Sequence, residues 1–221
     1  MKTTRGAPPR PRCSVLPFWR DLTNGRSHVA DGFYTEDQCY LLLAPNARPR
    51  RPLPTRRQTI LEAVLRGLPQ KGIAIHQRLA ASTIALHAKL ALEALGVTDR
   101  PSRAHPLLMR MARSASKPAE ARCTSWLVNG GSELSVLSMP RPEGALKSLL
   151  PCAEFEVIRG LVQGLSYEDI ALRRDISART VANQISAVFR RLGVSGRNAL
   201  LERLFLEQER ARAAKKSRAE A

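Results

Sequence analysis

Residues 176–197, ISARTVANQISAVFRRLGVSGR, combine an apolar stripe with an unusual polar surface. Aliphatic residues recur at the spacing of one side of an α-helix: Val181, Ile185, Val188 and Leu192. We expect that side to be buried. The other side has no acidic residue between positions 178 and 191, and it offers Arg179, Thr180, Asn183, Gln184, Ser186 and Arg190. These side chains donate hydrogen bonds or carry positive charge, so this helix is suited to contact an anionic surface.

Other residue types that could do chemistry form no recognisable site. The four cysteines are scattered, without a C-x-x-C pair or a histidine at ligand spacing: Cys13, Cys39, Cys123 and Cys152. We interpret them as reduced, and expect neither a zinc site nor a disulfide framework. The sequence also lacks an acid/base pair, a nucleophile elbow and a glycine-rich phosphate loop. We therefore expect no enzyme activity, no cofactor and no metal.

The charge balance favours a polyanionic partner. The chain of 221 residues has 36 Lys and Arg against 19 Asp and Glu, a formal net charge of +17. Each neutralised phosphate of a nucleic acid releases counterions, so such an excess favours DNA or RNA binding. A merely soluble basic protein, or one that lies on anionic lipid, would share this composition. There is no apolar run of about 18 residues and no apolar signal-peptide region, so we expect a cytoplasmic protein that does not span a membrane.

The chain contains an internal repeat at an offset of 97 residues, as Leu53 and Leu150 illustrate. Identical pairs follow without a gap: Pro54/Pro151, Gly67/Gly164, Leu68/Leu165, Ile73/Ile170, Ala74/Ala171, Ala81/Ala178, Thr83/Thr180, Ala85/Ala182, Leu95/Leu192, Gly96/Gly193, Val97/Val194 and Arg100/Arg197. Many other pairs exchange one aliphatic residue for another. We conclude that the sequence holds two copies of one unit.

Each copy is preceded by a predicted β-hairpin and a proline-rich link. Residues 19–45 and 125–140 place short aromatic or aliphatic runs around Asn-Gly turn signals. The expected organisation has six segments: a disordered basic and Pro-rich arm (1–17), a hairpin and linker (18–52), the first copy (53–115), a second hairpin and linker (116–147), the second copy (148–206) and a basic tail (207–221). The predicted fold is mainly α-helical with small β-hairpins.

The second copy has the signals of three short helices in sequence. Apolar residues at 155, 158, 161 and 162 mark a first helix that Gly164 can end. The pattern from Ser166 to Asp169 is a capping box, which predicts a second helix through about Arg174. Ser177 can cap the third helix and Gly193 can end it. Two helices joined by a tight turn, the later one with a polar outer face, describe a helix-turn-helix.

The residues GLSYEDIALRRDISARTVANQISAVFRRLGVSGR resemble the LuxR-type helix-turn-helix domain of bacterial transcription regulators. The resemblance covers residues 150–206, although Gln184 replaces the family's usual His, Arg191 its Lys, and Pro151 the usual helix cap. The first copy resembles the family more weakly, keeping the family His at 87 but departing at Pro69 and Gly72. Its outer face carries Leu86, Lys89, Leu90, Leu92 and Glu93. The first copy is therefore interpreted as a degenerate unit.

The resemblance implies a DNA-binding role for the third helix, residues 178–191. In this family the residues two, three and six after the signature Thr reach base edges, which here are Ala182, Asn183 and Ser186. It also assigns phosphate contacts to the residues around them: Ser177, Arg179, Thr180, Gln184 and Arg190. The core residues of the helix have no assigned contact role.

Plainer interpretations remain for several of these residues. Asn183 and Ser186 are also compatible with ordinary exposed positions, and Arg190 and Arg191 with stabilisation of the helix C-terminus. Arg197 is expected to anchor the last helix rather than to contact DNA. We interpret His87 as a half-buried packing residue. The linker arginines at 48–57 are compatible with either phosphate tracking or simple solvation.

The sequence thus predicts a sequence-specific transcription regulator that binds double-stranded DNA. The alternative is a helix-turn-helix module that binds RNA polymerase or another regulator without recognising sequence. We expect a homodimer on DNA, paired through an apolar side of the last helix: Leu200, Leu201, Leu204 and Phe205. Alternatively, the two copies within one chain pair with each other, which would also bring two recognition helices to a DNA site with two-fold symmetry.

Overall fold

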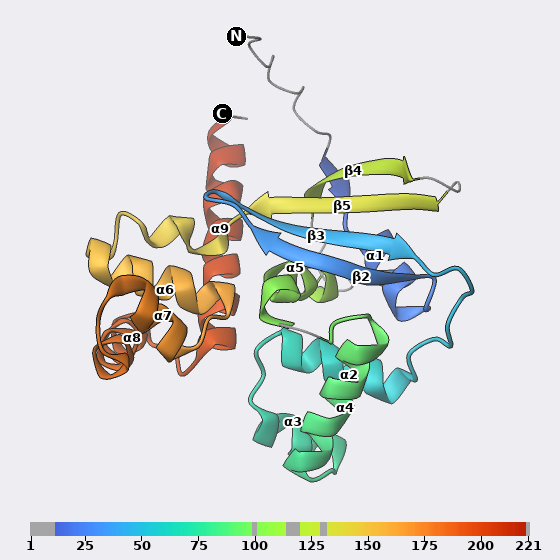
Figure 1. The fold of residues 1–221 in the computed structure, drawn as a ribbon, viewed down its shortest axis with the longest axis horizontal. Helices are drawn as coiled ribbons and strands as arrows, with labels where there is room; N and C mark the ends of the chain where they lie inside the picture. The colour runs from blue at the N-terminus through green and yellow to red at the C-terminus, as the bar shows by residue number, and fades with distance from the viewer. Residues whose placement is uncertain (1–11, 99–100, 114–119, 129–131, 220–221) are drawn as a thin grey trace.

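The computed structural model describes residues 12–98, 101–113, 120–128 and 132–219 (Figure 1). The first half holds β1 (Arg12–Ser14), α1 (Leu16–Thr23), β2 (Ser27–Tyr34), β3 (Gln38–Pro45), α2 (Thr55–Leu65), α3 (Gln70–Gln77), α4 (Ala81–Ala94) and α5 (Pro101–Arg113). The second holds β4 (Glu120–Val128), β5 (Ser132–Pro140), the 3-10 helix η1 (Pro142–Leu146), α6 (Cys152–Gln163), α7 (Tyr167–Arg174), α8 (Ala178–Leu192) and α9 (Arg197–Ala219). The fold is mainly helical with a small sheet.

The two hairpins join into one antiparallel sheet with the strand order β1-β4-β5-β3-β2. We expected two separate hairpins, but β3 pairs with β5, with Leu41 opposite Leu137. The first hairpin also turns at Thr35–Asp37, between β2 and β3. Asn24–Gly25, which we expected at that turn, instead follows the end of α1. The second Asn-Gly signal lies at 129–131, outside the described residues.

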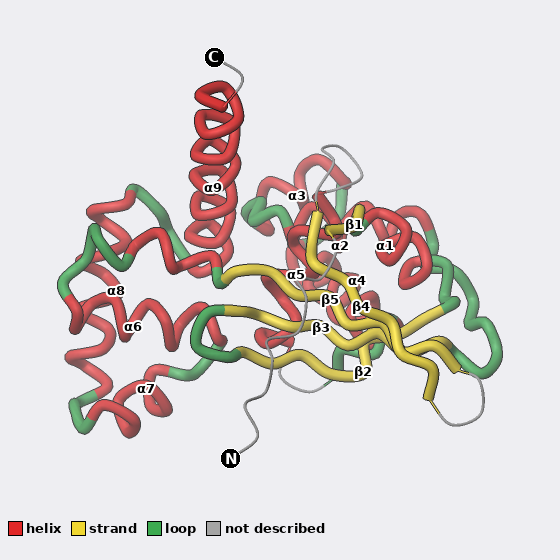
Figure 2. The backbone as a smooth tube through the Cα atoms, turned by 90° about the horizontal axis from the view of Figure 1, so that it is seen from above, coloured by secondary structure: helices red, strands yellow, loops and turns green. Residues whose placement is uncertain are grey.

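Helices cover one face of this sheet. Residues along β3 alternate between buried and half-buried, with Cys39, Leu41 and Leu43 on the buried side. Helix α5 packs against β2, β3 and β5, and α1 packs against β2 and α5. Figure 2 shows strands passing in front of α5 when seen from above. The core continues through α5 into α6 and α9, so the sheet and the second group of helices share one hydrophobic interior.

Helices α6–α9, the second helical unit, follow the local signals in the sequence. Gly164 has the left-handed conformation that ends α6, with φ 77°. The capping box at the start of α7 is formed, since Ser166 accepts a hydrogen bond from the Asp169 amide and Asp169 accepts one from the Ser166 amide. Helix α6 crosses close to α7, because a Cβ on Gly160 would lie 2.8 Å from Ile170 Cγ1. These predicted helix boundaries are confirmed.

Helices α2–α5, the first helical unit, have a second, smaller core of Ile60, Ile73, Ala74, Ile84 and Ala88. Helices α2, α3 and α4 begin at positions 55, 70 and 81, and α6, α7 and α8 begin at 152, 167 and 178. The residue after α3 and the residue after α7 are both left-handed without being glycine: Arg78 and Asp175, each with φ 53°. Pro69 at the start of α3 makes no side-chain cap.

Several boundary predictions were wrong. Within the expected arm 1–17, Arg12–Ser14 form β1 beside β4 and α1 begins at Leu16, while residues 1–11 lie outside the described part. The expected tail 207–221 continues α9 to Ala219. Cys13 and Cys123 form a disulfide between β1 and β4, which corrects our expectation that all four cysteines are reduced. The backbone pairing of β1 with β4 was not readable from the sequence, and it brings these two cysteines together.

Candidate nucleic-acid interface

Helix α8 is fixed by a cap at each end and by its apolar side. At its start, Ser177 Oγ accepts a hydrogen bond from the Thr180 amide at 3.0 Å. At its end, Gly193 has φ 64°. Val181, Ile185 and Val188 are fully buried, as predicted, and Leu192 packs partly buried against the same core. The opposite side of α8 must therefore face outward.

The outward side exposes most of the polar residues that the sequence placed there. Arg179, Asn183, Ser186 and Arg190 are exposed, and Ala182 is half-buried. Arg179 and Arg190 form no hydrogen bond or ion pair with any residue that the structure describes. Their guanidinium groups remain available to an anionic ligand.

Three predicted contact residues are less free than the arginines. The Ser177 hydroxyl is engaged in the helix cap and lies 2.9 Å from Thr180 Oγ1. Ser177 and Thr180 are nevertheless exposed. Gln184 is half-buried, with Oε1 removed from solvent, so only its NH2 group is suited to reach outward.

Two further arginines near α8 are occupied by structural contacts. Arg191 forms an ion pair with Glu154 in the first turn of α6, with N–O distances of 2.9 and 3.4 Å. Arg197 donates from Nη2 to the Val162 carbonyl at 2.7 Å. Burial lowers the pKa of Arg197. Arg197 thus anchors the start of α9, as we expected, and Arg191 ties α8 to α6.

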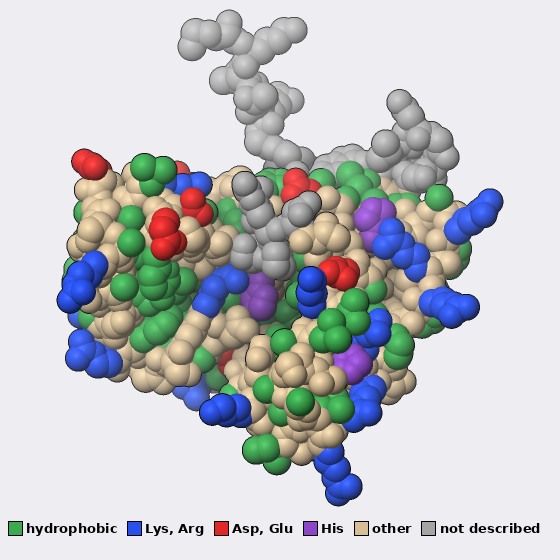
Figure 3. Space-filling model, turned by 60° about the horizontal axis from the view of Figure 1, so that its bottom comes forward, with side chains coloured by type: hydrophobic (Ala, Val, Ile, Leu, Met, Phe, Trp, Pro, Cys, Tyr) green, Lys and Arg blue, Asp and Glu red, His purple; other side chains and the backbone are tan. Residues whose placement is uncertain are grey.

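Figure 3 shows one face of the molecule, with the second helical unit on the left and the first below the centre. Lys and Arg side chains project along the edges of both units. In the first unit, the position that corresponds to Ser186 holds Lys89, whose Nζ lies 3.8 Å from Glu93. Leu86, which corresponds to Asn183, is exposed. Leu92 is half-buried against the main core, which corrects its predicted place on the outer face.

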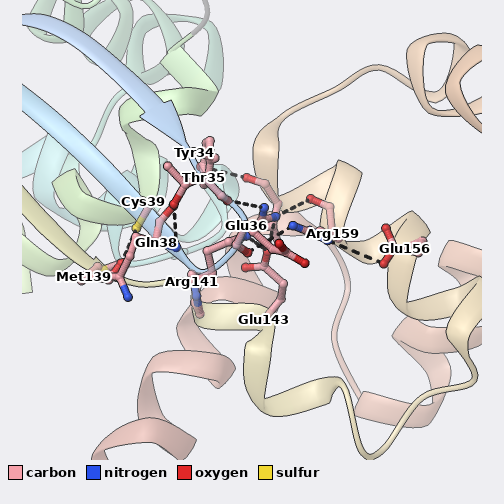
Figure 4. Close-up of polar contacts among 12 residues, drawn as sticks. Tyr34, Thr35, Glu36, Gln38, Cys39, Met139, Arg141, Glu143, Glu156 and Arg159 are labelled. Carbon is pink, nitrogen blue, oxygen red and sulfur yellow. Dashed lines mark hydrogen bonds and ion pairs between the residues drawn. The ribbon is translucent and has the colours of Figure 1, made fainter. Parts of the chain in front are cut away.

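A buried polar cluster fixes the second helical unit to the sheet (Figure 4). Arg141, directly after β5, forms an ion pair with Glu143 and donates to the Thr35 carbonyl at 3.2 Å and the Arg159 carbonyl at 3.4 Å. Arg159 in α6 donates to the Glu36 carbonyl at 3.1 Å. Burial raises the pKa of Glu143, while the neighbouring Arg141 lowers it.

Tyr34 adds a second connection between the sheet and α6. Its hydroxyl donates to the Val162 carbonyl at 3.2 Å, the same oxygen that Arg197 contacts. Burial raises the pKa of the Tyr34 hydroxyl, so it stays protonated and can donate. Sequence reasoning missed this cluster, because its members come from distant strands and helices and no short motif joins them.

The apolar side of α9 is buried inside the chain. Leu200, Leu201, Leu204 and Phe205 are at most 2% exposed. Helix α9 packs against η1 and α6, and Arg113 of α5 forms ion pairs with Glu202 and Glu209. The prediction that these four apolar residues pair two chains was wrong, because their own chain already covers them.

Comparison with known families identifies the second helical unit. Residues 150–203 match the family model of bacterial regulatory proteins of the luxR family, GerE. Residues 150–203 form a LuxR-type helix-turn-helix domain. LuxR-type domains are DNA-binding regulatory modules and not enzymes. No curated protein and no solved structure matches the chain.

Two further findings concern all the residues that the structure describes. None of its helices is long and apolar enough to cross a membrane. No group of three or more His, Cys, Asp or Glu residues in the described ranges is arranged to hold a metal ion.

Proposed function

We propose that this protein is a sequence-specific DNA-binding transcription regulator that places α8, with residues 178–191, in the major groove of double-stranded DNA. The observation that carries this proposal is the acid-free, exposed side of α8 within a LuxR-type domain. An α-helix fits the major groove of B-DNA, where each base pair presents its own pattern of donors and acceptors. The capped ends and buried stripe of α8 hold that side in a fixed orientation.

Base contacts are assigned to Ala182, Asn183 and Ser186. The exposed amide of Asn183 is suited to pair with the adenine edge, which offers one acceptor and one donor. Ser186 lies one helical turn further along and can donate or accept. The methyl group of Ala182 is suited to pack on a thymine methyl.

Phosphate contacts are assigned to Ser177, Arg179, Thr180, Gln184 and Arg190. Arg179 and Arg190 stand near the two ends of α8, exposed, with no partner among the described residues. They are placed to hold the helix in register on the backbone. Ser177 and Thr180 contribute hydroxyl groups at the helix start, and Gln184 contributes its NH2 group.

The first helical unit is proposed to be a degenerate helix-turn-helix of the same kind. Support comes from its helix starts and from equivalent left-handed positions: Gly67 and Gly164, Arg78 and Asp175, Gly96 and Gly193. Its third helix, α4, presents Leu86 and the paired Lys89 where α8 presents Asn183 and Ser186. Base recognition is therefore assigned to the second unit alone, and a supporting role to the first.

A second candidate function is a protein-interaction module that binds RNA polymerase or another regulator. One observation favours it for the first unit, where Leu68 and Leu86 are each more than half exposed, while the equivalent positions of the second unit hold the half-buried Leu165 and the polar Asn183. Aliphatic side chains on a surface are suited to protein contacts rather than to phosphates. This candidate assigns no base recognition to either unit.

A homodimer on DNA remains part of the proposal, because a two-fold DNA site requires two recognition helices. Its contact surface must differ from the buried side of α9. Pairing of the two units within one chain is the alternative route. Sedimentation of the protein on a short duplex distinguishes them, since two chains per site support the homodimer and one chain per site overturns it.

A competition titration tests the proposed function. Sites are first selected from a random duplex library, and the protein is then titrated with the selected duplex in an excess of random DNA. A specific regulator keeps a tight site under these conditions. If the excess of random DNA displaces the selected duplex, the protein is a sequence-indifferent coat. If the protein binds neither the selected duplex nor random DNA, the interaction module is supported.

A further inference from the structure

An open pocket lies where the sheet meets the LuxR-type domain. It has a volume of about 640 Å³. The end of β2 and the β2–β3 turn, from Phe33 to Glu36, form one wall, and α6 and α7 form the opposite wall with Arg159 and Arg173. Two smaller pockets of about 250 and 300 Å³ adjoin it, and Arg159 lines all three. Pockets of this size hold small metabolites.

The pocket is lined by several arginines, one of which has no partner among the described residues. Three arginines line it, Arg141, Arg159 and Arg173, against one acidic residue, Glu36. Glu143 neutralises Arg141. Arg159 forms an ion pair with Glu156 through Nη1 at 3.8 Å and donates from Nη2 to the Glu36 carbonyl. Arg173 is exposed and pairs with no residue in the described part of the chain. Guanidinium groups bind carboxylate and phosphate through two parallel hydrogen bonds.

The pocket also has an apolar rim. The Phe33 ring is 37% exposed and stacks on Tyr40, with ring centroids 4.8 Å apart. Leu165 lines the opposite wall. The stacked pair keeps the Phe33 ring in place, so its free face is available to a ring or a short hydrocarbon group of a ligand.

We propose that this pocket binds a small organic anion, whose phosphate or carboxylate group pairs with Arg173 beside Arg159 and whose apolar part lies against Phe33. Such a ligand touches the β2–β3 turn and the α6–α7 pair at once. It therefore stabilises the arrangement in which the LuxR-type domain is docked on the sheet. The proposal does not depend on which DNA sequence α8 recognises.

Calorimetric titration of the full-length chain with phenyl phosphate, benzoate and inorganic phosphate tests this proposal. Phenyl phosphate should saturate one site per chain. Arg173→Ala should weaken its binding by about tenfold or more, because a charge-assisted pair is lost. Arg20→Ala removes the same charge from α1, outside the pocket and outside the residues assigned to DNA, and should leave the affinity unchanged. Phe33→Ala should weaken phenyl phosphate and leave inorganic phosphate unaffected.

Three results would overturn the assignment. The first is that none of the three probes binds with saturation. The second is that Arg173→Ala and Arg20→Ala weaken phenyl phosphate equally, which would indicate attraction by net charge. The third is that Arg173→Ala weakens duplex DNA as much as Arg179→Ala does and duplex DNA displaces the probe, which would make the pocket part of the DNA surface.

Discussion

Arg141 and Glu143 form an ion pair that is almost completely removed from water, with side chains only 4% and 1% exposed. The pair sits where the chain leaves the sheet and enters the LuxR-type domain. Arg141 also donates to carbonyl groups of the β2–β3 turn and of α6. One side chain therefore connects the sheet, the link and the domain.

Removing one partner of this pair should destabilise the whole protein. Arg141→Ala leaves the Glu143 carboxylate buried without its cation, and the free energy of unfolding should fall by about 3–5 kcal/mol. Arg26→Ala is the matched control, because its pair with Asp21 is exposed, and it should cost less than about 1 kcal/mol. Urea denaturation measures both. Equal effects of the two variants would show that the buried pair has no special role.

Two glycines should respond in opposite ways to alanine. A Cβ on Gly160 would lie 2.8 Å from Ile170 Cγ1, so Gly160→Ala should separate α6 from α7 and cost about 1–3 kcal/mol. Gly72 lies in α3 with nothing within 4 Å of an added Cβ. Gly72→Ala should instead stabilise the protein by about 0.5–1 kcal/mol through helix propensity. Thermal unfolding of both variants checks this, and a stabilising Gly160→Ala would contradict the described packing of α6 on α7.

The local parts of the LuxR-type domain could be predicted from the sequence, because their signals lie within a few residues. Ser166, Ser177 and Gly193 each mark a helix end by their own chemistry. The pairing of β3 with β5 could not be predicted, since equally apolar hairpins are compatible with several partners. The stripe around Leu204 showed that one side of α9 is buried, but periodicity does not identify what covers it. The Ala, Lys and Arg residues after position 206 are good helix formers. Their helix propensity was a signal that α9 continues into the segment we expected to be a basic tail.

The stability of the protein should fall in weak acid because of His105 in α5. The residue is half-buried, but its Nε2 atom is removed from solvent. Burial, followed by the nearby Arg197, lowers the pKa of His105 from 6.5 to about 3. Between these values the unfolded chain binds a proton that the folded chain does not. The contribution of neutral His105 to the free energy of unfolding is therefore complete above about pH 6.5 and is lost as the pH falls toward 3.

His105→Gln should remove that part of the pH dependence. Urea denaturation of the parent and the variant from pH 4 to pH 8 measures the difference. The stability of the parent should decline more steeply below about pH 6.5. Superimposable slopes of the two proteins in this range would show that His105 does not retain a lowered pKa in the folded state.

The LuxR-type domain should need η1 to fold without the rest of the chain. Leu146 in η1 is fully buried, and the Pro142 carbonyl accepts from Gln208 of α9 at 3.4 Å. A fragment of residues 140–221 keeps η1 and the Arg141–Glu143 pair, so it should unfold cooperatively and still select DNA, though more weakly. A fragment of residues 148–221 lacks both and should not unfold cooperatively.

Circular dichroism and duplex selection compare the two fragments. If both fragments are equally folded, then η1 has no part in the stability of the domain. If the longer fragment is folded but indifferent to DNA sequence, while residues 44–115 select a sequence, then base recognition belongs to the first helical unit.

The central claim, that α8 separates base recognition from phosphate binding, is tested by binding Asn183→Ala and Arg179→Ala to preferred and scrambled duplexes at several salt concentrations. Asn183→Ala should cost about 1–3 kcal/mol on the preferred duplex only and leave the salt dependence unchanged. Arg179→Ala should weaken both duplexes by a similar factor and reduce the slope of log K against log salt by about 1. Both residues are exposed, so neither variant should lose more than about 0.5 kcal/mol of folding stability. Equal weakening of both duplexes by Asn183→Ala would contradict the base contact assigned to that residue.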